Sequence, residues 1–437
     1  TAAPGTAIAL TFDAAGEAPF TINYADAGEV ILTAQATIGG STVSGNVTFQ
    51  SAPDHLLVYS DDANAACTPA SATCSVFKKA GEVFPLKVKA ACWEAVPSAN
   101  PATAPETPNF ILAGNVMGRN LVAPAGGNAG SVSATQFDFG AADRGVATVS
   151  QSVSEVGVFQ FVVTPASYLG NVLPTATSAN IGRFVPDHID TVVTEACGSF
   201  TYSGQPMSVQ LNARNAAGGT TLNYDASAGF AKAVTMTASG ATGTLSANTI
   251  AASAYLLGVA SATTPAFTFS TAPSLPATIT LGGSDSDNVA LVEVSPADPA
   301  KLRTANIRSG RLALSNAYGS QLLPLAVPIK TQSWSTSGWI TNAADSCTTL
   351  TVPTSGNGGL SNGLSSKTTA TLSAPVVAGD AKARLTAPLD ATPGVVDISG
   401  NVVRGSNTWL SLSTPTARAC FGLCGPRSPV IYLRERF

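Results

Sequence analysis

The chain has 437 residues, of which only 11% are charged and 45% are hydrophobic, and its net charge is −4. Globular chains usually contain about 25% charged residues, and the absence of a basic excess here argues against nucleic-acid binding. The hydrophobic content excludes disorder caused by low hydrophobicity and high charge. The longest apolar runs, 156–166 and 322–329, are too short to cross a bilayer. With only two histidines, the composition points away from an enzyme.

Residues 1–51 are predicted to be a partial β-sandwich made of N-terminal strands. Apolar residues alternate at Val30, Leu32 and Ala34. Residues 26–34 resemble 155–163, which come near the end of the first internal repeat. By analogy, the opening strands of this sandwich are absent. Two interpretations stay open: residues 1–51 dock on the next repeat or form a small sheet of their own, or a strand from a neighbouring molecule completes them. The start at Thr1, without Met or signal peptide, is expected of a mature protein or a fragment.

An internal repeat organises the middle of the chain. Pro53-Asp54-His55 recurs as Pro186-Asp187-His188, and the segments that follow alternate apolar residues with polar ones in both copies: Phe84, Leu86, Val88, Ala90 and Met207, Val209, Leu211, Ala213. A period of two indicates a half-buried strand. His55 and His188 occupy equivalent points, which predicts a turn at the entry of each domain rather than two active sites.

Frequent Gly, Pro, Asn and Ser turn signals between short strands predict a β-sandwich in each copy. We therefore assign an immunoglobulin-like repeat to 52–184 and another to 185–296. Thr107-Pro-Asn-Phe110 of the first copy resembles Thr221-Leu-Asn-Tyr224 of the second.

The segment 297–437 breaks the repeat pattern and is predicted to be a divergent C-terminal β-domain. Strands are expected at 311–319 and 322–329 around an Asn/Gly turn, and again at 409–413 and 430–434. The last of these could pair within its own domain or be offered to a partner. The predicted fold class is all-β: tandem immunoglobulin-like β-sandwich domains followed by this C-terminal domain.

Seven cysteines favour structural disulfides in an oxidising compartment, and their spacing matches no zinc site. Plausible pairs are Cys67 with Cys74, and Cys347 with either Cys420 or Cys424. Cys92 and Cys197 bridge each other or stay free, so the connectivity remains open.

No catalytic or cofactor-binding residue is predicted. Weak Ca²⁺ candidates are Asp285 and Asp287 in one cluster and Asp61 and Asp62 in another, because carboxylates are the oxygen ligands that Ca²⁺ prefers; the spacing is not that of an EF-hand, and solvated turns are favoured. The G-x-S-x-G match at 359–363 lacks a strand–turn–helix context and a downstream His, and is taken as chance. Aromatic rings able to stack on a glycan are Trp93, Trp334, Trp339 and Trp409, although core or interface positions are favoured for them.

Several longer motifs carry a resemblance to a known family. They are Ile181-Gly-Arg-Phe-Val-Pro-Asp-His188, Arg311-Leu-Ala-Leu-Ser-Asn-Ala-Tyr-Gly-Ser-Gln-Leu-Leu-Pro324, Asp345-Ser-Cys347, Ala417-Arg-Ala-Cys-Phe-Gly422 and Ile431-Tyr-Leu-Arg-Glu435. Together they resemble the C-terminal region of MshQ-like proteins, which are associated with biogenesis of the mannose-sensitive haemagglutinin type IV pilus of Gram-negative bacteria. The resemblance implies a large exported surface protein without an assigned activity, and it supplies no catalytic residues. It departs at Cys424, where relatives are expected to lack a second cysteine.

These observations predict a non-enzymatic, exported protein of the cell surface or pilus, with a structural role. The protein is predicted to act by adhesion, by assembly into a fibre, or by both. Head-to-tail β-strand complementation is the route considered for assembly, and a carbohydrate-binding tip adhesin is the alternative. The expected partners are further copies of the chain, other surface or pilus components, or a glycan. Nucleic acid, a membrane span and a resident cofactor are not expected, and the predicted location is extracellular.

Overall fold

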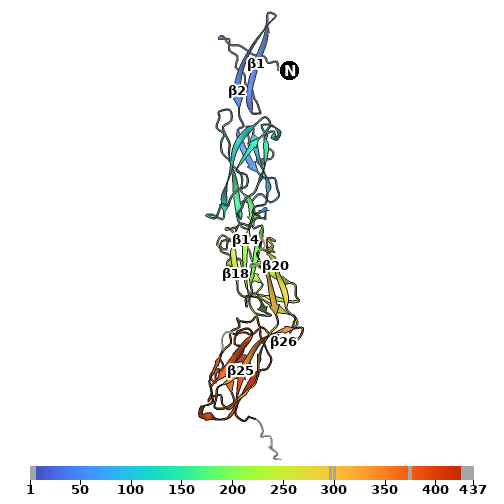
Figure 1. Cartoon of the computed structure of the whole chain (residues 1–437). Coiled ribbons are helices and arrows are strands. Elements are labelled where there is room, and N and C mark those ends of the chain that lie inside the picture. Colours follow the sequence, from blue (N-terminus) through green and yellow to red (C-terminus); the bar gives the residue numbers. More distant parts are fainter. Residues whose placement is uncertain (1–5, 295–297, 299–301, 373–375, 425–437) are drawn as a thin grey trace, which may run out of the picture. The chain divides into compact units, whose positions relative to one another are not determined.

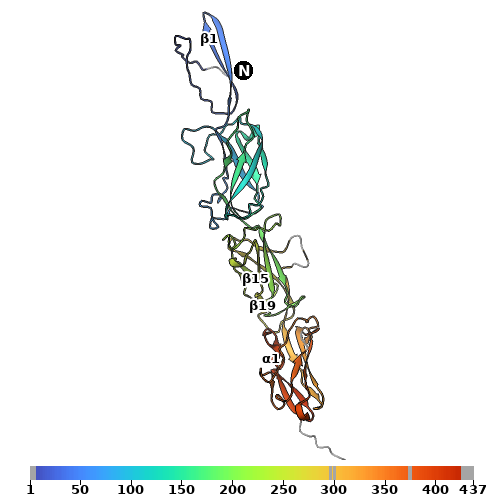
Figure 2. The same ribbon diagram turned by 90° about the vertical axis from the view of Figure 1, so that its left-hand side faces the viewer.

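The computed structural model describes residues 6–294, 298, 302–372 and 376–424. The chain divides into two compact units, 1–185 and 186–437, and each is described separately. Strands dominate both units (Figures 1 and 2), so the all-β prediction is confirmed. The described helical elements are short: η1 (Ala141–Asp143), η2 (Ala252–Ala254), η3 (Leu389–Ala391) and α1 (Gly400–Arg404).

The first unit begins with an antiparallel hairpin, shown in blue in Figure 1. It consists of β1 (Gly28–Ile38) and β2 (Ser41–Ser51), which pair along their whole length and form a two-stranded sheet of their own. Within the single chain, the described residues of 1–51 therefore form a small sheet of their own.

Residues 52–185, which we name domain A, form a sandwich of two sheets. The first sheet contains, in order, β3 (His55–Tyr59), β5 (Phe84–Ala91) and β8 (Val146–Gln151). The second contains β4 (Lys78–Lys79), β11 (Ile181–Val185), β9 (Gly157–Thr164), β6 (Leu112–Ala123) and β7 (Gln136–Phe139), with β10 (Ala176–Thr177) paired to β9. Apolar side chains from both sheets form one core between them, which includes Phe84, Val88, Phe161 and Phe184.

The second unit begins with domain B, residues 186–309. One sheet contains β18 (Val259–Ala262), β14 (Ser208–Arg214), β12 (His188–Thr194) and β21 (Leu291–Val292). The other contains β13 (Thr201–Tyr202), β22 (Thr304–Arg308), β20 (Ala277–Asp285), β15 (Val234–Ser239) and β17 (Thr249–Ile250). β16 (Gly243–Ser246) pairs with β19 (Ala266–Phe269). Strand β22 lies beyond residue 296, where the sequence division ends the second repeat.

Domain C, residues 310–424, completes the described part of the chain. Its first sheet contains β28 (Ala370–Leu372), β29 (Asp380–Leu385), β25 (Leu325–Ser335), β23 (Gly310–Leu314) and β31 (Ser411–Leu412), and β26 (Gly338–Thr341) pairs with β25. Its second sheet contains β24 (Ala317–Gly319), β32 (Thr416–Phe421), β30 (Gly394–Ser399) and β27 (Leu360–Ser361). The short helix α1 is capped by Ser399, whose side chain accepts a hydrogen bond from the Val402 N–H. The strand expected at 430–434 lies outside the described residues.

Domains A and B share one topology. β5 pairs with β3 and β8, as β14 pairs with β12 and β18. The short strand before each of them pairs in parallel with the last strand of its domain, β4 with β11 and β13 with β22. The two segments that the sequence matched therefore occupy equivalent places in two copies of one sandwich.

The equivalence extends to the loop that follows each central strand. The backbone N–H of Thr107 donates to the carbonyl of Ala90 (2.9 Å), and that of Thr221 donates to the carbonyl of Ala213 (3.0 Å). Each threonine hydroxyl donates to the same carbonyl oxygen, at 3.1 and 3.2 Å. The sequence similarity of 107–110 to 221–224 thus corresponds to the same pair of hydrogen bonds between this loop and the end of the central strand in both domains.

The shared loop closure predicts equivalent effects of two glycine substitutions. Gly145 and Gly258 both have φ of +82°, and a Cβ at either would lie 2.5 Å from the carbonyl oxygen of Thr107 or Thr221. We expect Gly145→Ala and Gly258→Ala each to lower the free energy of unfolding by about 2 kcal/mol or more, because the left-handed conformation and the backbone clash are both unfavourable. Gly118→Ala, where a Cβ meets open space, should change it by less than about 0.5 kcal/mol. Urea unfolding of the three variants measures these differences. Unequal effects of Gly145→Ala and Gly258→Ala would contradict the equivalence, and equal stability of all three would contradict the predicted clash.

Candidate functional site

The hairpin β1–β2 separates apolar and polar residues between its two faces. Residues directly opposite each other in a β-ladder share a face, and the register pairs Val30 with Phe49, Leu32 with Val47 and Ala36 with Val43. The opposite face carries polar side chains except for Ile31: Glu29, Thr33, Gln35, Thr37, Thr42, Ser44, Asn46, Thr48 and Gln50. An apolar layer of this kind is the inner half of a sandwich.

The apolar face of the hairpin is partly exposed. Towards the turn, Val47 is 56% exposed, Val43 54% and Ile38 69%. Towards the base, Val30, Leu32 and Phe49 are half-buried, and the Tyr24 ring packs edge-on against Phe49 with centroids 6.4 Å apart. In the part of the chain that the structure describes, no third strand pairs with either outer edge of the hairpin. Contiguous exposed apolar surface of this kind marks an interaction site, and an open strand edge can accept a further strand.

The chain before the hairpin adds to this exposed apolar surface. Residues 6–25 have alternating apolar side chains without forming described strands, and six of them are at least 38% exposed: Ile8, Leu10, Phe12, Phe20, Ile22 and Tyr24. This alternation is typical of strands that pack one face on a core. The N-terminal segment therefore contains the residue pattern of a sandwich without a buried interior.

The base of the hairpin is fixed to domain A. Ala27 is 1% exposed and belongs to the core of that domain. The carboxylate of Asp26 accepts hydrogen bonds from the backbone N–H of Asn109 (2.9 Å) and from its side-chain amide (2.7 Å). The hydroxyl of Ser51 donates to the carbonyl of Asp26 (2.6 Å). The partly exposed face thus projects from an anchored base.

Cys92 lies at the same base and is a free, buried cysteine. Its thiol donates to the carbonyl of Ala25 at 3.0 Å. Burial raises the pKa of this thiol above its ordinary value, and the negative charges of Asp26, Glu106 and Glu94 raise it further. The thiolate is therefore disfavoured near neutral pH, and Cys92 is an unreactive core residue.

A cluster of buried polar side chains joins domains B and C within the second unit. The hydroxyl of Tyr202 donates to Asp345 (2.9 Å) and accepts from the side-chain amide of Asn342 (2.8 Å). Asp345 also accepts from the hydroxyl of Thr348 (2.8 Å) and from the backbone N–H groups of Thr348 (3.0 Å) and Cys347 (3.2 Å). Each buried polar group of this cluster has a partner, so the cluster stabilises the contact between the domains.

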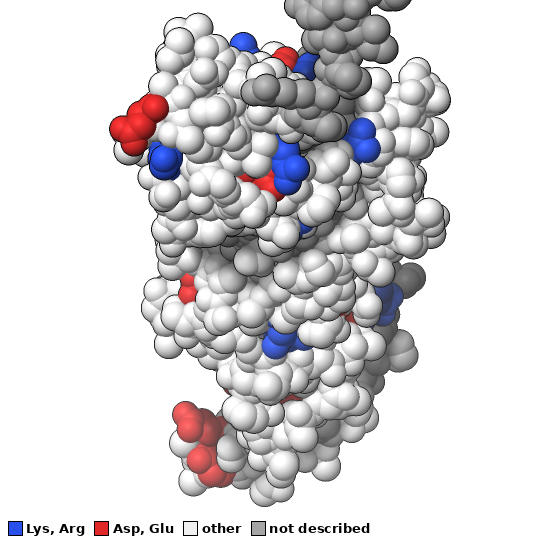
Figure 3. All heavy atoms as spheres, turned by 90° about the horizontal axis from the view of Figure 1, so that it is seen from below, with Lys and Arg blue, Asp and Glu red and all other residues white. Residues whose placement is uncertain are grey.

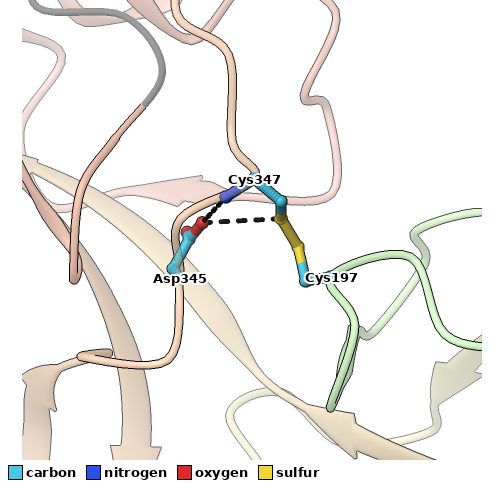
Figure 4. Close-up of side chains that lie close together, drawn as sticks. All are labelled: Cys197, Asp345 and Cys347. Carbon is cyan, nitrogen blue, oxygen red and sulfur yellow. Dashed lines mark hydrogen bonds between the residues drawn. A yellow bond between two sulfur atoms is a disulfide. The ribbon is translucent and has the colours of Figure 1, made fainter.

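A disulfide between Cys197 and Cys347 lies beside this cluster (Figure 4). The sequence predicted that Cys347 pairs with Cys420 or Cys424; instead it pairs with Cys197, 150 residues earlier in the chain, and Cys420 pairs with Cys424. Cys67 pairs with Cys74. The bridge between Cys197 and Cys347 makes the contact between domains B and C covalent.

The same residues form the group most similar to a metal site. Ligand atoms of Cys197, Asp345 and Cys347 lie within 4.8 Å of one another, and among the described residues this is the group of His, Cys, Asp or Glu that converges in this way. A thiolate, not a disulfide sulfur, is the form that binds a metal. Because the two sulfurs are bonded to each other, the donor set does not fit a metal ion, and the group acts as a clamp.

The four calcium candidates lie in two separate places and have protein partners. Asp285 is buried, and its carboxylate accepts from the Tyr224 hydroxyl (2.6 Å) and from the backbone N–H groups of Asp287 (2.8 Å) and Val289 (2.9 Å). Burial raises the pKa of Asp285. Asp61 forms an ion pair with Lys87, and Asp62 forms one with Lys78 at 3.2 Å. Asp285 thus holds a turn, and the other pair forms surface ion pairs.

The remaining residues singled out by the sequence are structural in their contacts. Nδ1 of His55 lies 2.8 Å from Asp54, and Nδ1 of His188 lies 2.8 Å from Asp187, so the two histidines make the same contact in the two repeats. Ser361 of the G-x-S-x-G match lies on the two-residue strand β27, without the helix that a nucleophile elbow requires.

Removal of the Tyr202 hydroxyl should weaken the clamp in a pH-dependent way. Burial, together with the negative charge of Asp345, raises the pKa of Tyr202 above its ordinary value of 10.0. We expect Tyr202→Phe to cost about 1–3 kcal/mol at neutral pH, because a buried hydrogen-bonded hydroxyl is lost. Because the pKa is raised in the folded state, the neutral phenol contributes fully to the free energy of unfolding below pH 10. This contribution falls as the pH rises above 10.

Urea unfolding of wild type and Tyr202→Phe from pH 7 to pH 11 checks this sign. The difference in unfolding free energy should be constant up to about pH 10 and should shrink above it. A difference that grows above pH 10 would contradict the assignment of the hydroxyl as donor to Asp345.

Loss of the Asp26 anchor should expose the buried thiol. We expect Asp26→Ala to increase the rate at which Cys92 reacts with a disulfide reagent at pH 8 by about tenfold, because hydrogen bonds to a charged group worth about 1.5 kcal/mol are lost. Asp13→Ala, which removes a carboxylate bonded only to Ala15 and Glu17 in an exposed turn, is the matched control. Equal rates in the two variants would show that Asp26 does not hold the hairpin base.

Comparison with known proteins places the chain in a family. Models of four consecutive domains of one family match it: the first, described as "Domain of unknown function (DUF6701), first Ig-like domain", at 1–51, and the second, third and fourth DUF6701 domains at 52–150, 155–309 and 308–436. The third model begins before β9 and β11, which the structure nevertheless pairs into the sheet of domain A.

Solved structures show only weak likeness. The structure described as "Crystal structure of invasin: a bacterial integrin-binding protein" aligns at 13% identity and a TM-score of 0.23, over 84% of this chain and 60% of that one. The Yersinia pseudotuberculosis adhesin InvE aligns at 12% identity and a TM-score of 0.21, over 67% of this chain and 80% of that one. The chain thus spans less than two thirds of the invasin structure, and at these TM-scores neither structure supports an inference.

No curated protein matches the chain. Within the described residues, no helix has the length and apolar character needed to span a membrane. Since the four family models together cover almost the whole sequence, the chain belongs to the DUF6701 family.

Proposed function

We propose that this chain is a non-enzymatic, exported structural protein of the cell surface that assembles head-to-tail through the hairpin β1–β2. The partly exposed apolar face of that hairpin is the observation that carries the proposal. Three disulfides suit an oxidising compartment outside the cytoplasm. The surface also suits a structural role, because charged side chains are scattered over a mostly uncharged face (Figure 3).

The partner of the hairpin is proposed to be a strand from a second copy. Residues 1–51 match a domain described as Ig-like, and an Ig-like sandwich needs two packed sheets. The described residues of this segment supply one hairpin. Strands from β3 onward are already paired in the sheets of domains A, B and C, so they are not free to cover it.

The donor segment is proposed to be 430–433 of the next molecule. Its residues, Val430-Ile-Tyr-Leu433, form an apolar run and lie outside the described part of the chain. A strand added to an open edge gains backbone hydrogen bonds, and its alternate side chains gain apolar contacts. Because the donor and the acceptor are different parts of the chain, the contact is heterologous and each addition leaves a new open hairpin, as fibre growth requires.

Association with a pilus is proposed from the resemblance of the motifs to MshQ-like proteins. The alternative function predicted from the sequence is a carbohydrate-binding tip adhesin, which would bind a glycan through exposed tryptophan or tyrosine rings instead of using the hairpin.

A charge placed on one or the other face of the hairpin tests the proposal. We expect Val47→Asp to abolish assembly, because the apolar side chains of a strand added at the hairpin edge would lie on the same face as this charge and would bury it without a partner. Thr48→Asp is the matched control: it puts the same charge at the adjacent position on the polar face, and both positions are exposed in the single chain. Sedimentation velocity and negative-stain electron microscopy of both variants and wild type give the result.

The outcomes separate the possible occupants of the face. Wild-type and Thr48→Asp oligomers with monomeric Val47→Asp support self-assembly. A closed dimer sensitive to Val47→Asp indicates that two hairpins pack on each other and contradicts head-to-tail growth. A wild-type monomer at every concentration overturns the proposal. Deletion of 426–437 should also prevent assembly while the thermal unfolding of domain C is unchanged; a loss of domain C stability instead would assign that strand to its own domain.

A further inference from the structure

A hollow in the second unit lies where domains B and C meet and is separate from the hairpin. Its volume is about 480 Å³, within the range of roughly 300–1,000 Å³ that small-ligand sites have. Two indole rings, Trp339 from β26 and Trp409 from the loop before β31, contribute to its lining together with Phe269. Small residues, among them Gly204 and Gly310, also line it and leave room between the larger side chains.

We infer that this hollow binds a neutral saccharide, with Trp339 and Trp409 as the aromatic surfaces that receive the sugar. Three features of the lining support this class of ligand: its aromatic rings, its hydroxyl groups and its lack of charge.

The lining combines apolar and hydroxyl groups in the way that a pyranose does. A pyranose ring has C–H groups on its faces and hydroxyls at its edge, and indole rings offer a large rigid apolar surface with one polar atom. The hydroxyl residues Ser203, Thr268, Ser309, Thr408 and Ser411 also line the hollow. The hydroxyls of Ser203 and Ser309 accept from the backbone N–H groups of Phe269 and Ser274, and that of Ser411 donates to the carbonyl of Gly310. Sites for small molecules typically place a few polar groups in a mainly apolar lining.

The side chains that line the hollow carry no charge, and the Arg311 guanidinium lies outside the lining, 4.6 Å from the centroid of the Trp339 ring. None of the described residues that line the hollow is Asp, Glu, Lys or Arg. A carboxylated or phosphorylated ligand would lose its hydration without gaining an opposite charge from these side chains. An uncharged polyhydroxyl compound does not have this difficulty, since serine and threonine hydroxyls both donate and accept hydrogen bonds.

Trp409 provides a donor that lacks an acceptor. Within the described part of the chain, its buried Nε1 has no hydrogen-bond partner. Buried polar groups are almost always paired, so this atom is an exception beside the hollow. The side chain of Trp409 also packs against the buried cluster of Phe200, Tyr202 and Leu410, while the residue lines the hollow. Binding should therefore change tryptophan fluorescence.

Trp339 is held in position by two neighbours that are not among the residues lining the hollow, one of which, Arg311, lies over its ring. Its ring packs edge-on against Trp334 of the same hairpin, with centroids 5.4 Å apart. The guanidinium of Arg311 lies 4.6 Å from its centroid and donates to the side chain of Gln332 (2.7 Å). A preorganised ring loses little conformational freedom when a ligand binds.

The experiment measures binding of neutral saccharides to the full chain. Methyl hexopyranosides and unbranched gluco-, manno- and galacto-oligosaccharides are titrated while tryptophan fluorescence and ligand-observed NMR saturation transfer are recorded. We expect saturable binding of at least one neutral saccharide. Trp339→Ala should weaken it at least about tenfold, as expected for loss of one aromatic contact. Trp93→Ala is the matched control, because Trp93 is 71% exposed and belongs to the first unit.

A second variant, Thr408→Arg, keeps the inference testable if Trp339→Ala does not fold. Thr408 is exposed at the rim of the hollow, so Thr408→Arg fills the space without removing a core side chain, and it should abolish binding while thermal unfolding stays as in wild type. Two results would overturn the inference: no saturable binding of any neutral saccharide, or binding that both Trp339→Ala and Thr408→Arg leave unchanged. Neither result depends on whether the hairpin assembles.

Discussion

The requirement that an apolar sheet face be covered governs this molecule. A strand places alternate side chains on opposite faces, so any strand with an apolar period of two needs a second layer. In domain A that layer is the opposing sheet, and Phe84 and Phe161 meet across the core at 5.6 Å between ring centroids. In hairpin β1–β2 the same pattern is present without the second layer, and the resulting exposed surface is the basis of the proposed assembly.

The clamp between domains B and C meets a different requirement, that buried polar groups have partners. Asp345 and Tyr202 are both 0% exposed, and each is unfavourable in a core by itself. Together with Asn342 they satisfy one another, and the disulfide beside them prevents the domains from separating while the chain is oxidised. The clamp also brings Gly310 and Trp409 of domain C next to Gly204 of domain B, so the hollow exists only because the two domains are held together.

Local patterns in the sequence predicted the strands and the repeat, because a period of two and a turn signal are properties of a few consecutive residues. Features that join distant residues were not accessible in this way. Cys197 and Cys347 are 150 positions apart, and their pairing depends on how two domains meet, which no spacing rule encodes. Asp285 illustrates the same limit. The sequence shows the turn at Asp285, but it does not show that the buried carboxylate accepts a hydrogen bond from the Tyr224 hydroxyl, 61 positions away.

The two proposed sites use the same low-charge chemistry for different purposes. At the hairpin, backbone groups at an open edge and a broad apolar face suit another polypeptide strand, which brings both kinds of group. At the hollow, indole rings and serine and threonine side chains are part of the lining, so recognition there is proposed to depend on indole surfaces and hydroxyls. A strand is too wide and too continuous for a hollow of about 480 Å³, whereas a sugar offers too little apolar area to cover a hairpin of eleven residue pairs. The physical form of each site therefore favours a different class of partner, a polypeptide strand for the hairpin and a neutral saccharide for the hollow.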